Sequence, residues 1–203
     1  MLEILTVCTG NICRSPLAAV ILRARLADLG VDVRSAGTRG LPSAPMTPEA
    51  VDLALARGID PAETGAHLSR YLTEAHLSTP DLILAMTREH RRAIAELAPS
   101  RLRSTFTIRE FARLSRATSD DEIVAAARPH DTDEERVRAA SALLAGKRGL
   151  VEPAADPADD DVIDPYGRSW KTYQVSASQL DPALDEVVRV VRLAVAANPA
   201  VAD

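Results

Sequence analysis

Aromatic residues are scarce in this 203-residue chain, in which tryptophan, tyrosine and phenylalanine together make up 3% of the sequence. Proteins that bind single-stranded nucleic acid stack the bases on aromatic side chains, and this chain offers few of them. The net charge is −5, so the basic excess that marks nucleic-acid-binding proteins is also missing. We therefore expect no nucleic-acid partner, and a core built from leucine, valine, isoleucine and alanine.

Long hydrophobic runs are missing too. None approaches the roughly 20 apolar residues that a membrane-spanning helix needs. The first residues, Met1 to Leu5, contain neither a basic segment nor a small-residue cleavage site, so they indicate a first strand rather than a signal peptide. We expect a cytoplasmic protein with no membrane partner.

Cysteine occurs only twice, as Cys8 and Cys13, which lie too close together in the sequence to staple a fold. In a reducing compartment, reactive chemistry explains such cysteines better. No group of histidines, cysteines and acidic residues has the spacing of metal ligands, so we expect no metal and no cofactor. The chain is long enough to bury a full core without disulfides, and we interpret residues 1–203 as a single domain.

Apolar runs alternate with helical patterns along most of the chain. Such alternation predicts right-handed crossovers between parallel strands, and hence an α/β fold with a four-stranded parallel sheet and helices on both faces. Asp181-Pro182 is a good start signal for the last helix. The acidic, proline-containing stretch 152–161 indicates a flexible surface loop. The expected strands are residues 2–7, 31–38, 81–86 and 104–108.

The most informative stretch follows the first expected strand and reads Cys8-Thr9-Gly10-Asn11-Ile12-Cys13-Arg14-Ser15-Pro16. Its backbone N–H groups, from Thr9 to Arg14, can point inward as a nest for an anion. Gly10 and Asn11 are the residues best able to adopt the left-handed conformation that a tight loop requires. Ser15 can cap the helix that follows.

Cys8 is the candidate nucleophile of this loop. A thiolate is the attacking form of cysteine, and a helix N-terminus together with a cation favours it. The helix beginning near Ser15 and the Arg14 side chain supply both. Arg14 also offers a planar fork that matches two phosphate oxygens. The stretch therefore predicts a site that binds a phosphate-like dianion and attacks its phosphorus.

This string resembles the active-site signature of the low-molecular-weight protein tyrosine phosphatases. Further stretches resemble the same family in the same order, and residues 2–112 and 162–195 are covered. The residues between them, about 113–161, are interpreted as a lineage-specific insertion. The additional matching stretches are Ser35-Ala36-Gly37-Thr38, His67-Leu68-Ser69-Arg70, Asp81–Met86 and Val162-Ile163-Asp164-Pro165-Tyr166-Gly167.

The resemblance implies hydrolysis of phosphotyrosine through a cysteinyl-phosphate on Cys8. Arg14 would bind the phosphoryl oxygens, and Asp164 would protonate the leaving phenolate and then activate water. Pro165 would fix the backbone that presents Asp164. His67 would be hydrogen-bonded toward the loop through Ser15. The resemblance assigns no role to His76, His90 or His130.

Two residues are candidates for the walls of the substrate pocket. Tyr166 follows the Asp164-Pro165 pair and can face an aromatic ring, while Leu41 occupies the position where some members of the family carry tryptophan. A pocket without an aromatic pair resembles that of the bacterial members. Relatives that act on phosphoarginine carry threonine at the position of Ile12, so Ile12 favours phosphotyrosine.

Three alternatives remain at this point. Arsenate reductases share the fold, and those that need three cysteines are disfavoured, whereas those that use an external thiol are compatible with the sequence. A protein arginine phosphatase is the second alternative, and a non-catalytic phosphoprotein-binding module is the third.

The resemblance also implies a redox role for Cys13, which would trap oxidised Cys8 as a disulfide; the other reading is an inert residue packed under the loop. The implied partner is a phosphotyrosine protein, for which a bacterial tyrosine kinase is the candidate. Phosphate-like oxyanions are expected to inhibit.

Overall fold

The computed structural model describes residues 1–39 and 43–197. Four parallel strands form its central sheet in the order β2-β1-β3-β4. Their bounds are Glu3–Cys8 for β1, Asp32–Gly37 for β2, Leu82–Ala85 for β3 and Thr105–Thr107 for β4. The predicted α/β fold with a four-stranded parallel sheet is confirmed.

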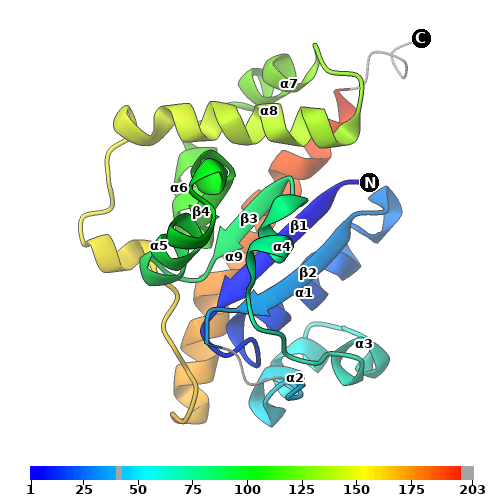
Figure 1. Ribbon diagram of the computed structural model, residues 1–203, viewed down its shortest axis with the longest axis vertical. Helices are drawn as coiled ribbons and strands as arrows, with labels where there is room; N and C mark the ends of the chain where they lie inside the picture. Colours follow the sequence, from blue (N-terminus) through cyan, green and yellow to red (C-terminus); the bar gives the residue numbers. More distant parts are fainter. Residues whose placement is uncertain (40–42, 198–203) are drawn as a thin grey trace.

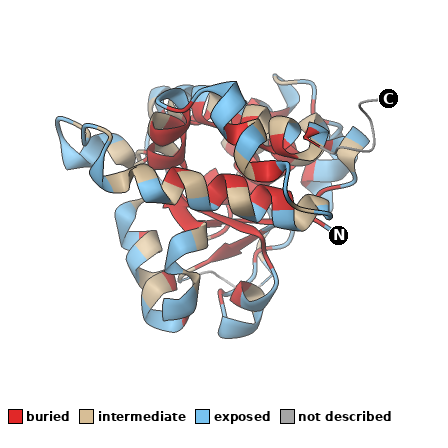
Figure 2. Ribbon diagram, turned by 90° about the horizontal axis from the view of Figure 1, so that it is seen from above, coloured by how far each residue is buried: buried red, intermediate tan, exposed pale blue. Residues whose placement is uncertain are grey.

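Alternate residues of β1 enter two separate hydrophobic clusters, which is why the sheet is covered on both faces. Ile4 and Cys8 belong to the larger cluster, whereas Leu5 and Val7 belong to the smaller one. Successive side chains of a strand point to opposite faces, so a continuous apolar run suits a strand buried on both sides. Figure 2 shows the buried strands enclosed between layers of helices.

The larger cluster contains α1 (Arg14–Arg25), α6 (Ile108–Arg116) and the long α9 (Trp170–Ala196). The smaller cluster contains residues of α4 (Glu74–Ser78) and α5 (Arg88–Leu97) on the other face. The helices α2 (Pro48–Leu55) and α3 (Pro61–Gly65) lie in the connection between β2 and β3 (Figure 1).

The helices α7 (Asp120–Ala127) and α8 (Asp133–Gly146) lie at the end of the sheet where the strands begin, opposite the loop that follows β1 (Figure 1). Each begins with a reciprocal capping box, Ser119 with Glu122 and Thr132 with Glu135. Such boxes satisfy the otherwise unpaired N–H groups of a first turn.

The predicted insertion at 113–161 contributes to the main core. Ile123 of α7 and Val137 and Leu144 of α8 are fully buried in the larger cluster. The chain that follows was expected to be a flexible loop, but Pro157–Asp160 forms a 3-10 turn. Arg113 pairs with Asp160 at 2.9 Å, which ties this turn to α6. The single domain and the origin of the insertion stay predictions.

The start of α9 differs from the expectation. Asp181-Pro182 was predicted to open the helix, yet it begins at Trp170 and Pro182 lies inside it. Proline inside a helix costs about 3 kcal/mol or more because it removes a backbone hydrogen bond. Leu180 and Leu184 are fully buried on either side of it, and burial of such a side chain contributes about 1.5–3 kcal/mol. Burial on both sides therefore outweighs the proline.

In the described part of the chain, no helix combines the length and apolar character that crossing a membrane would require.

Candidate active site

The loop between β1 and α1 surrounds the thiol of Cys8. The Cys8 side chain is 2% exposed, and its Sγ lies 3.0 Å from Ser15 Oγ and 3.3 Å from the backbone nitrogen of Asn11, which donates to it. The helix α1 begins at Arg14 and directs the unpaired N–H groups of its first turn toward the same region. The sulfur is thus surrounded by polar groups of the loop and of the first helical turn.

Ser15 does not cap α1, contrary to the expectation. Cys13 occupies the cap position and makes no side-chain capping bond. The Ser15 hydroxyl turns instead toward Cys8 and toward the Asn11 amide, 3.0 Å away. The same hydroxyl also lies 3.4 Å from the carbonyl oxygen of Ala36, so it bonds within the site and not to the helix start.

Asn11 is the structural centre of the loop and is fully buried. Its amide nitrogen donates to Ser15 Oγ at 3.0 Å and to Ser35 Oγ at 2.8 Å, and its side-chain oxygen accepts from the backbone of Arg70 at 2.9 Å. One side chain therefore joins the loop to β2 and to the segment before α4.

His67 contacts the loop, but through a different residue from the one expected. Its Nε2 lies 2.8 Å from the carbonyl oxygen of Asn11, and this is the hydrogen bond that joins it to the loop. Burial lowers the pKa of His67, so the neutral ring donates through Nε2 to that carbonyl. The sequence resemblance located the histidine but could not say which loop atom it reaches.

Close backbone packing beside the loop explains why residue 37 is a glycine. A Cβ on Gly37 would lie 2.6 Å from the carbonyl oxygen of Thr9 and 3.0 Å from the backbone nitrogen of Asn11. Of the two residues expected to be left-handed, Asn11 has a φ of 55°, whereas Gly10 does not adopt a positive φ. The strain of the loop is therefore concentrated at Asn11, where the hydrogen bonds compensate for it.

Arg14 joins the loop to the distant acidic segment. Its side chain is 4% exposed, one terminal nitrogen donates to the carbonyl of Val162 at 3.0 Å, and the other forms an ion pair with Asp164 at 2.6 Å. Its Nε is buried and has no hydrogen-bond partner among the described residues. A buried guanidinium N–H without an acceptor is costly, and a phosphoryl oxygen in the loop would supply that acceptor.

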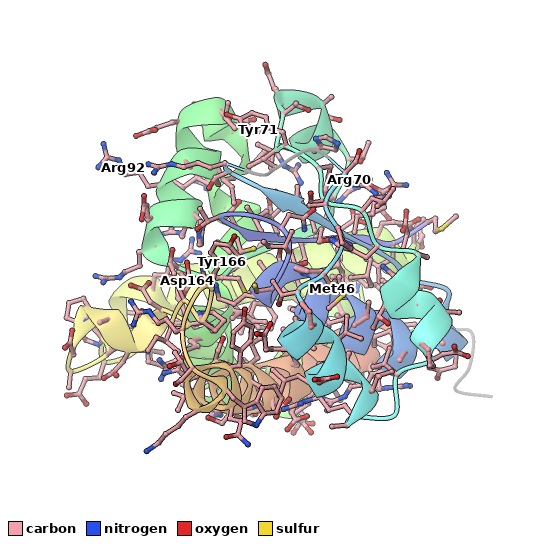
Figure 3. The ribbon with its side chains drawn as sticks, turned by 90° about the horizontal axis from the view of Figure 1, so that it is seen from below. Met46, Arg70, Tyr71, Arg92, Asp164 and Tyr166 are labelled. Carbon is pink, nitrogen blue, oxygen red and sulfur yellow. The ribbon has the colours of Figure 1, made fainter. Side chains whose placement is uncertain are left out.

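Asp164 is distinguished from the acidic residues before it by its position. Asp160 pairs with Arg113, and Asp161 accepts from the backbone and guanidinium of Arg88. Asp164 is half-exposed and turns to Arg14, with its Oδ1 accepting from the backbone N–H of Tyr166 at 3.2 Å. Figure 3 shows Asp164 beside Tyr166 on the face of the molecule where the strands end.

These groups line one pocket of about 190 Å³. Tyr166 stands at its rim and is 60% exposed. Pro165, between Asp164 and Tyr166, has no side chain in the pocket lining, whereas Arg39 joins the lining without having been predicted. Leu41, the other predicted wall, lies outside the described residues. The lining residues are Cys8, Thr9, Gly10, Ile12, Cys13, Arg14, Arg39, Asp164 and Tyr166.

His90 is a residue of the site that the sequence reading missed. It is 3% exposed on α5, and its Nε2 lies 2.8 Å from Thr9 Oγ1 while its Nδ1 lies 2.8 Å from Thr87 Oγ1. Burial, reinforced by the nearby Arg14 charge, lowers the pKa of His90 to about 4. Thr87 caps α5, and the spacing Thr-x-x-His at a helix start was the available signal, although it is also a common structural pattern.

Cys13 lies beneath the loop between α2 and α9. Its Sγ is 3.5 Å from Thr47 Oγ1 and 3.6 Å from Tyr173 Oη. Burial raises the pKa of the Cys13 thiol, which keeps it protonated at neutral pH. The two cysteines are therefore in different environments, and Cys8 is the one with the anion-stabilising donors.

A larger depression of about 710 Å³ lies between α6 and α9. It contains no cysteine or histidine, and its Arg113 and Arg116 are engaged with Asp160 and Glu186. The described residues also contain no grouping of histidine, cysteine and acidic side chains that could hold a metal ion. The chemistry is therefore concentrated in the smaller pocket around Cys8.

Two named bacterial phosphatases are similar in sequence to this chain. The sequence is 45% identical over 97 residues to the low molecular weight protein-tyrosine-phosphatase Etp of Escherichia coli, a match that covers 48% of this chain and 62% of Etp. It is 38% identical over 112 residues to the protein-arginine-phosphatase of Bacillus subtilis, covering 54% of this chain and 72% of that protein.

Solved structures with the same architecture extend over most of the chain. The low molecular weight protein tyrosine phosphatase of T. tengcongensis matches with a TM-score of 0.63 and 28% identity, over 93% of this chain and 98% of that one. A YwlE mutant from Bacillus subtilis matches with a TM-score of 0.65 and 26% identity, over 95% of this chain and 99% of that one. The family model described as low molecular weight phosphotyrosine protein phosphatase matches residues 3–147, and this chain belongs to that family.

Proposed function

We propose that this protein hydrolyses phosphotyrosine in proteins through a cysteinyl-phosphate on Cys8. The observation that carries the proposal is the convergence of Cys8, Arg14 and Asp164 on one pocket, with the Nε of Arg14 buried and unpartnered among the described residues. A nucleophile, an anion-binding fork and a carboxylate are the groups that a metal-free phosphatase needs.

In the first step the Cys8 thiolate attacks phosphorus, the S–P bond forms and the bond from phosphorus to the tyrosine oxygen breaks. Protonated Asp164 gives its proton to the leaving phenolate oxygen. The loop N–H groups and Arg14 bind the phosphoryl oxygens as their charge redistributes. Acid assistance of this kind increases the reaction rate by about 10²–10⁴-fold.

In the second step Asp164, now a carboxylate, takes a proton from a water molecule that attacks the phosphorus of the intermediate. The S–P bond breaks, and inorganic phosphate and the Cys8 thiolate are released. The Ser15 hydroxyl, 3.0 Å from the sulfur, stabilises the thiolate as leaving group. The protons and electron pairs balance without any cofactor.

The ion pair between Arg14 and Asp164 gives the substrate a role in assembling the site. A phosphoryl dianion competes with Asp164 for Arg14, and Asp164 is 46% exposed and therefore able to turn away. Pro165 restricts the backbone on which Asp164 turns. Substrate binding would thus release the carboxylate toward the leaving oxygen while keeping it at the pocket mouth.

The test is a comparison of substrates on one preparation of the protein. A phosphotyrosine peptide, a phosphoarginine peptide and arsenate with candidate thiol reductants are supplied at matched concentrations, and the release of phosphate or the formation of arsenite is measured. We expect the phosphotyrosine peptide to be turned over fastest. Dominant arsenate reduction would contradict the proposal, and binding without turnover would identify a phosphoprotein-binding module.

Arginine phosphatase activity is the second candidate, because a protein-arginine-phosphatase matches the chain at 38% identity. Ile12 lines the pocket, and its larger apolar side chain favours the flat ring of phosphotyrosine over a phosphorylated guanidinium. Replacing Ile12 with threonine tests this preference, since the ratio of phosphoarginine to phosphotyrosine turnover should rise.

Cys13 is proposed to protect Cys8 by forming a disulfide with it after oxidation. Both residues line the same pocket, and the Cys8 sulfur carries the anion-stabilising contacts that make a cysteine easy to oxidise. Peroxide treatment should therefore inactivate the protein in a way that thiols reverse. If Cys13→Ser recovers as fully as the wild type, the protective role is wrong.

The proposed partner is a phosphotyrosine protein in the cytoplasm, with a bacterial tyrosine kinase as the candidate. Phosphate-like oxyanions are expected to compete for the loop, because they present the same tetrahedral oxygens to Arg14 and the N–H groups.

A further inference from the structure

Arg39 is fixed to the catalytic loop at its backbone, whereas its side chain is exposed. Its backbone N–H donates to the carbonyl of Thr9 at 2.9 Å, immediately after the corresponding bond from Thr38 to Cys8. Its side chain lines the pocket with Cys8 and Asp164 and is 78% exposed. The guanidinium therefore projects from a rigid base at the mouth of the pocket.

The ion partner of Arg39 holds it only weakly. Its terminal nitrogen lies 3.7 Å from Glu89, whose side chain is 80% exposed. Exposed pairs of this kind contribute about 0–1 kcal/mol, because water screens the charges and both long side chains lose freedom. A carboxylate brought by a ligand could replace Glu89 at little cost.

The neighbouring arginines are engaged more firmly. Arg88 approaches Asp161 with its backbone N–H at 2.7 Å and with its guanidinium at 3.0 Å. Arg14 is 4% exposed and is turned inward to the phosphate position. Arg14 and Arg39 are the two cations of the pocket lining. Since Arg14 is turned inward, Arg39 is the cation available to the part of a ligand that lies outside the pocket.

We propose that Arg39 is a specificity-determining residue that binds a carboxylate of an aspartate or glutamate next to the phosphorylated tyrosine of the substrate. This inference rests on the proposed phosphotyrosine phosphatase activity. With the phosphate held by Arg14, the peptide chain on either side of the tyrosine lies at the rim, where the planar fork of Arg39 can donate two hydrogen bonds to a carboxylate. In the free protein the ion partner of that guanidinium is Glu89, at 3.7 Å.

The experiment uses peptides that differ only at the residue next to phosphotyrosine, which is Glu, Gln or Lys, placed on either side in separate sets. The wild type should show kcat/KM about two- to five-fold higher for Glu than for Gln on at least one side, the size expected for one exposed ion pair. Lys should be poorer than Gln. Raising the salt concentration should reduce the preference.

Two arginines allow a matched comparison. Arg39→Ala should remove the preference for Glu, and its p-nitrophenyl phosphate turnover shows whether the phosphate site itself has changed. Arg92→Ala removes the same charge from an exposed side chain that pairs with Glu96 and lies away from Asp164 and Tyr166 (Figure 3). It should keep the preference. Glu89→Gln should increase it, because the competing carboxylate is gone.

Three results would overturn the role of Arg39: an absence of preference in the wild type, an equal loss in the two arginine variants, or a matching loss of p-nitrophenyl phosphate turnover. The last result would place Arg39 in the phosphate site. Failure of the wild type to turn over any phosphotyrosine substrate would instead overturn the proposed function, and so the two failures are distinguishable.

Discussion

The two halves of the candidate site are built in different ways. The loop from Cys8 to Ser15 is buried except at the half-buried Thr9 and Gly10, and the Asn11 side chain ties it to Ser35 and Arg70. The segment around Asp164 is half-exposed, and Arg14 is its link to the loop through an ion pair and a bond to Val162. The difference suggests that anion binding needs a preorganised cradle, whereas proton transfer needs a carboxylate that can move.

Removal of the Cys8 nucleophile should have the largest effect on the site. Cys8→Ser should reduce turnover of phosphotyrosine peptides below detection while the loop still binds phosphate, since the serine hydroxyl is far less ionised than a thiol. Single-turnover assays and phosphate titration monitored by NMR would measure the two effects. Turnover close to that of the wild type would contradict the cysteinyl-phosphate mechanism.

The moving half of the site is tested by Asp164→Ala. We expect kcat for aryl phosphates to fall by at least about ten-fold, within the range for a lost general acid. The loss should be larger for phenyl phosphate than for p-nitrophenyl phosphate, because phenolate is the more basic leaving group and needs the proton more.

Asp159→Ala is the matched control for that variant. It removes a carboxylate from the same acidic stretch, but Asp159 lines the depression between α6 and α9 and not the pocket around Cys8. It should leave both rates unchanged. Equal losses in the two variants would show that general charge, and not proton transfer from Asp164, accounts for the effect.

The rigid half of the site is tested by Asn11→Ala. The change removes the fully buried amide and the left-handed preference of asparagine, and leaves the Arg70 N–H without its acceptor. An unsatisfied buried group costs about 1–3 kcal/mol, so the unfolding free energy should fall by about that amount. Urea denaturation measures it, with Gln174→Ala, which removes an exposed amide from α9, as a control that should have no effect. Unchanged stability in Asn11→Ala would show that the network does not stabilise the loop.

An effect of similar size is expected from His90, and it depends on pH. Its folded-state pKa of about 4 lies below the usual 6.5. As pH falls, His90 therefore takes up a proton in the unfolded chain at a higher pH than in the folded one. The contribution of His90 is therefore fully present above the unfolded pKa and is lost as pH falls toward the folded one. Between about pH 8 and about pH 5 the wild type should lose about 2 kcal/mol more unfolding free energy than His90→Gln, which cannot titrate there.

His67 has a lowered pKa as well, but it is present in both proteins and cancels in that comparison. Urea unfolding at several pH values supplies the measurement. Parallel stability profiles for the wild type and His90→Gln would show that His90 is not held neutral beside Arg14.

Much of the site could be predicted because its loop is continuous in the sequence. Cys8 and Arg14 lie on either side of one short loop between a strand and a helix, and local chemistry indicates both roles. The strands were predicted nearly to their ends, since β1 is apolar on both faces. The predicted start of α9 was wrong because it depended on a local signal, Asp181-Pro182. The helix is stabilised by burial along its whole face, and a pattern of two residues does not include that burial.

The sequence by itself determined the parallel α/β order and the anion-binding loop, because periodic apolar residues and adjacent functional groups act over short distances. Only the tertiary structure decided that His67 reaches the Asn11 carbonyl and that His90 reaches Thr9. The same holds for the Arg14–Asp164 pair and for Arg39 at the pocket mouth. These contacts join residues on different elements, and their partners are set by how the helices pack on the sheet.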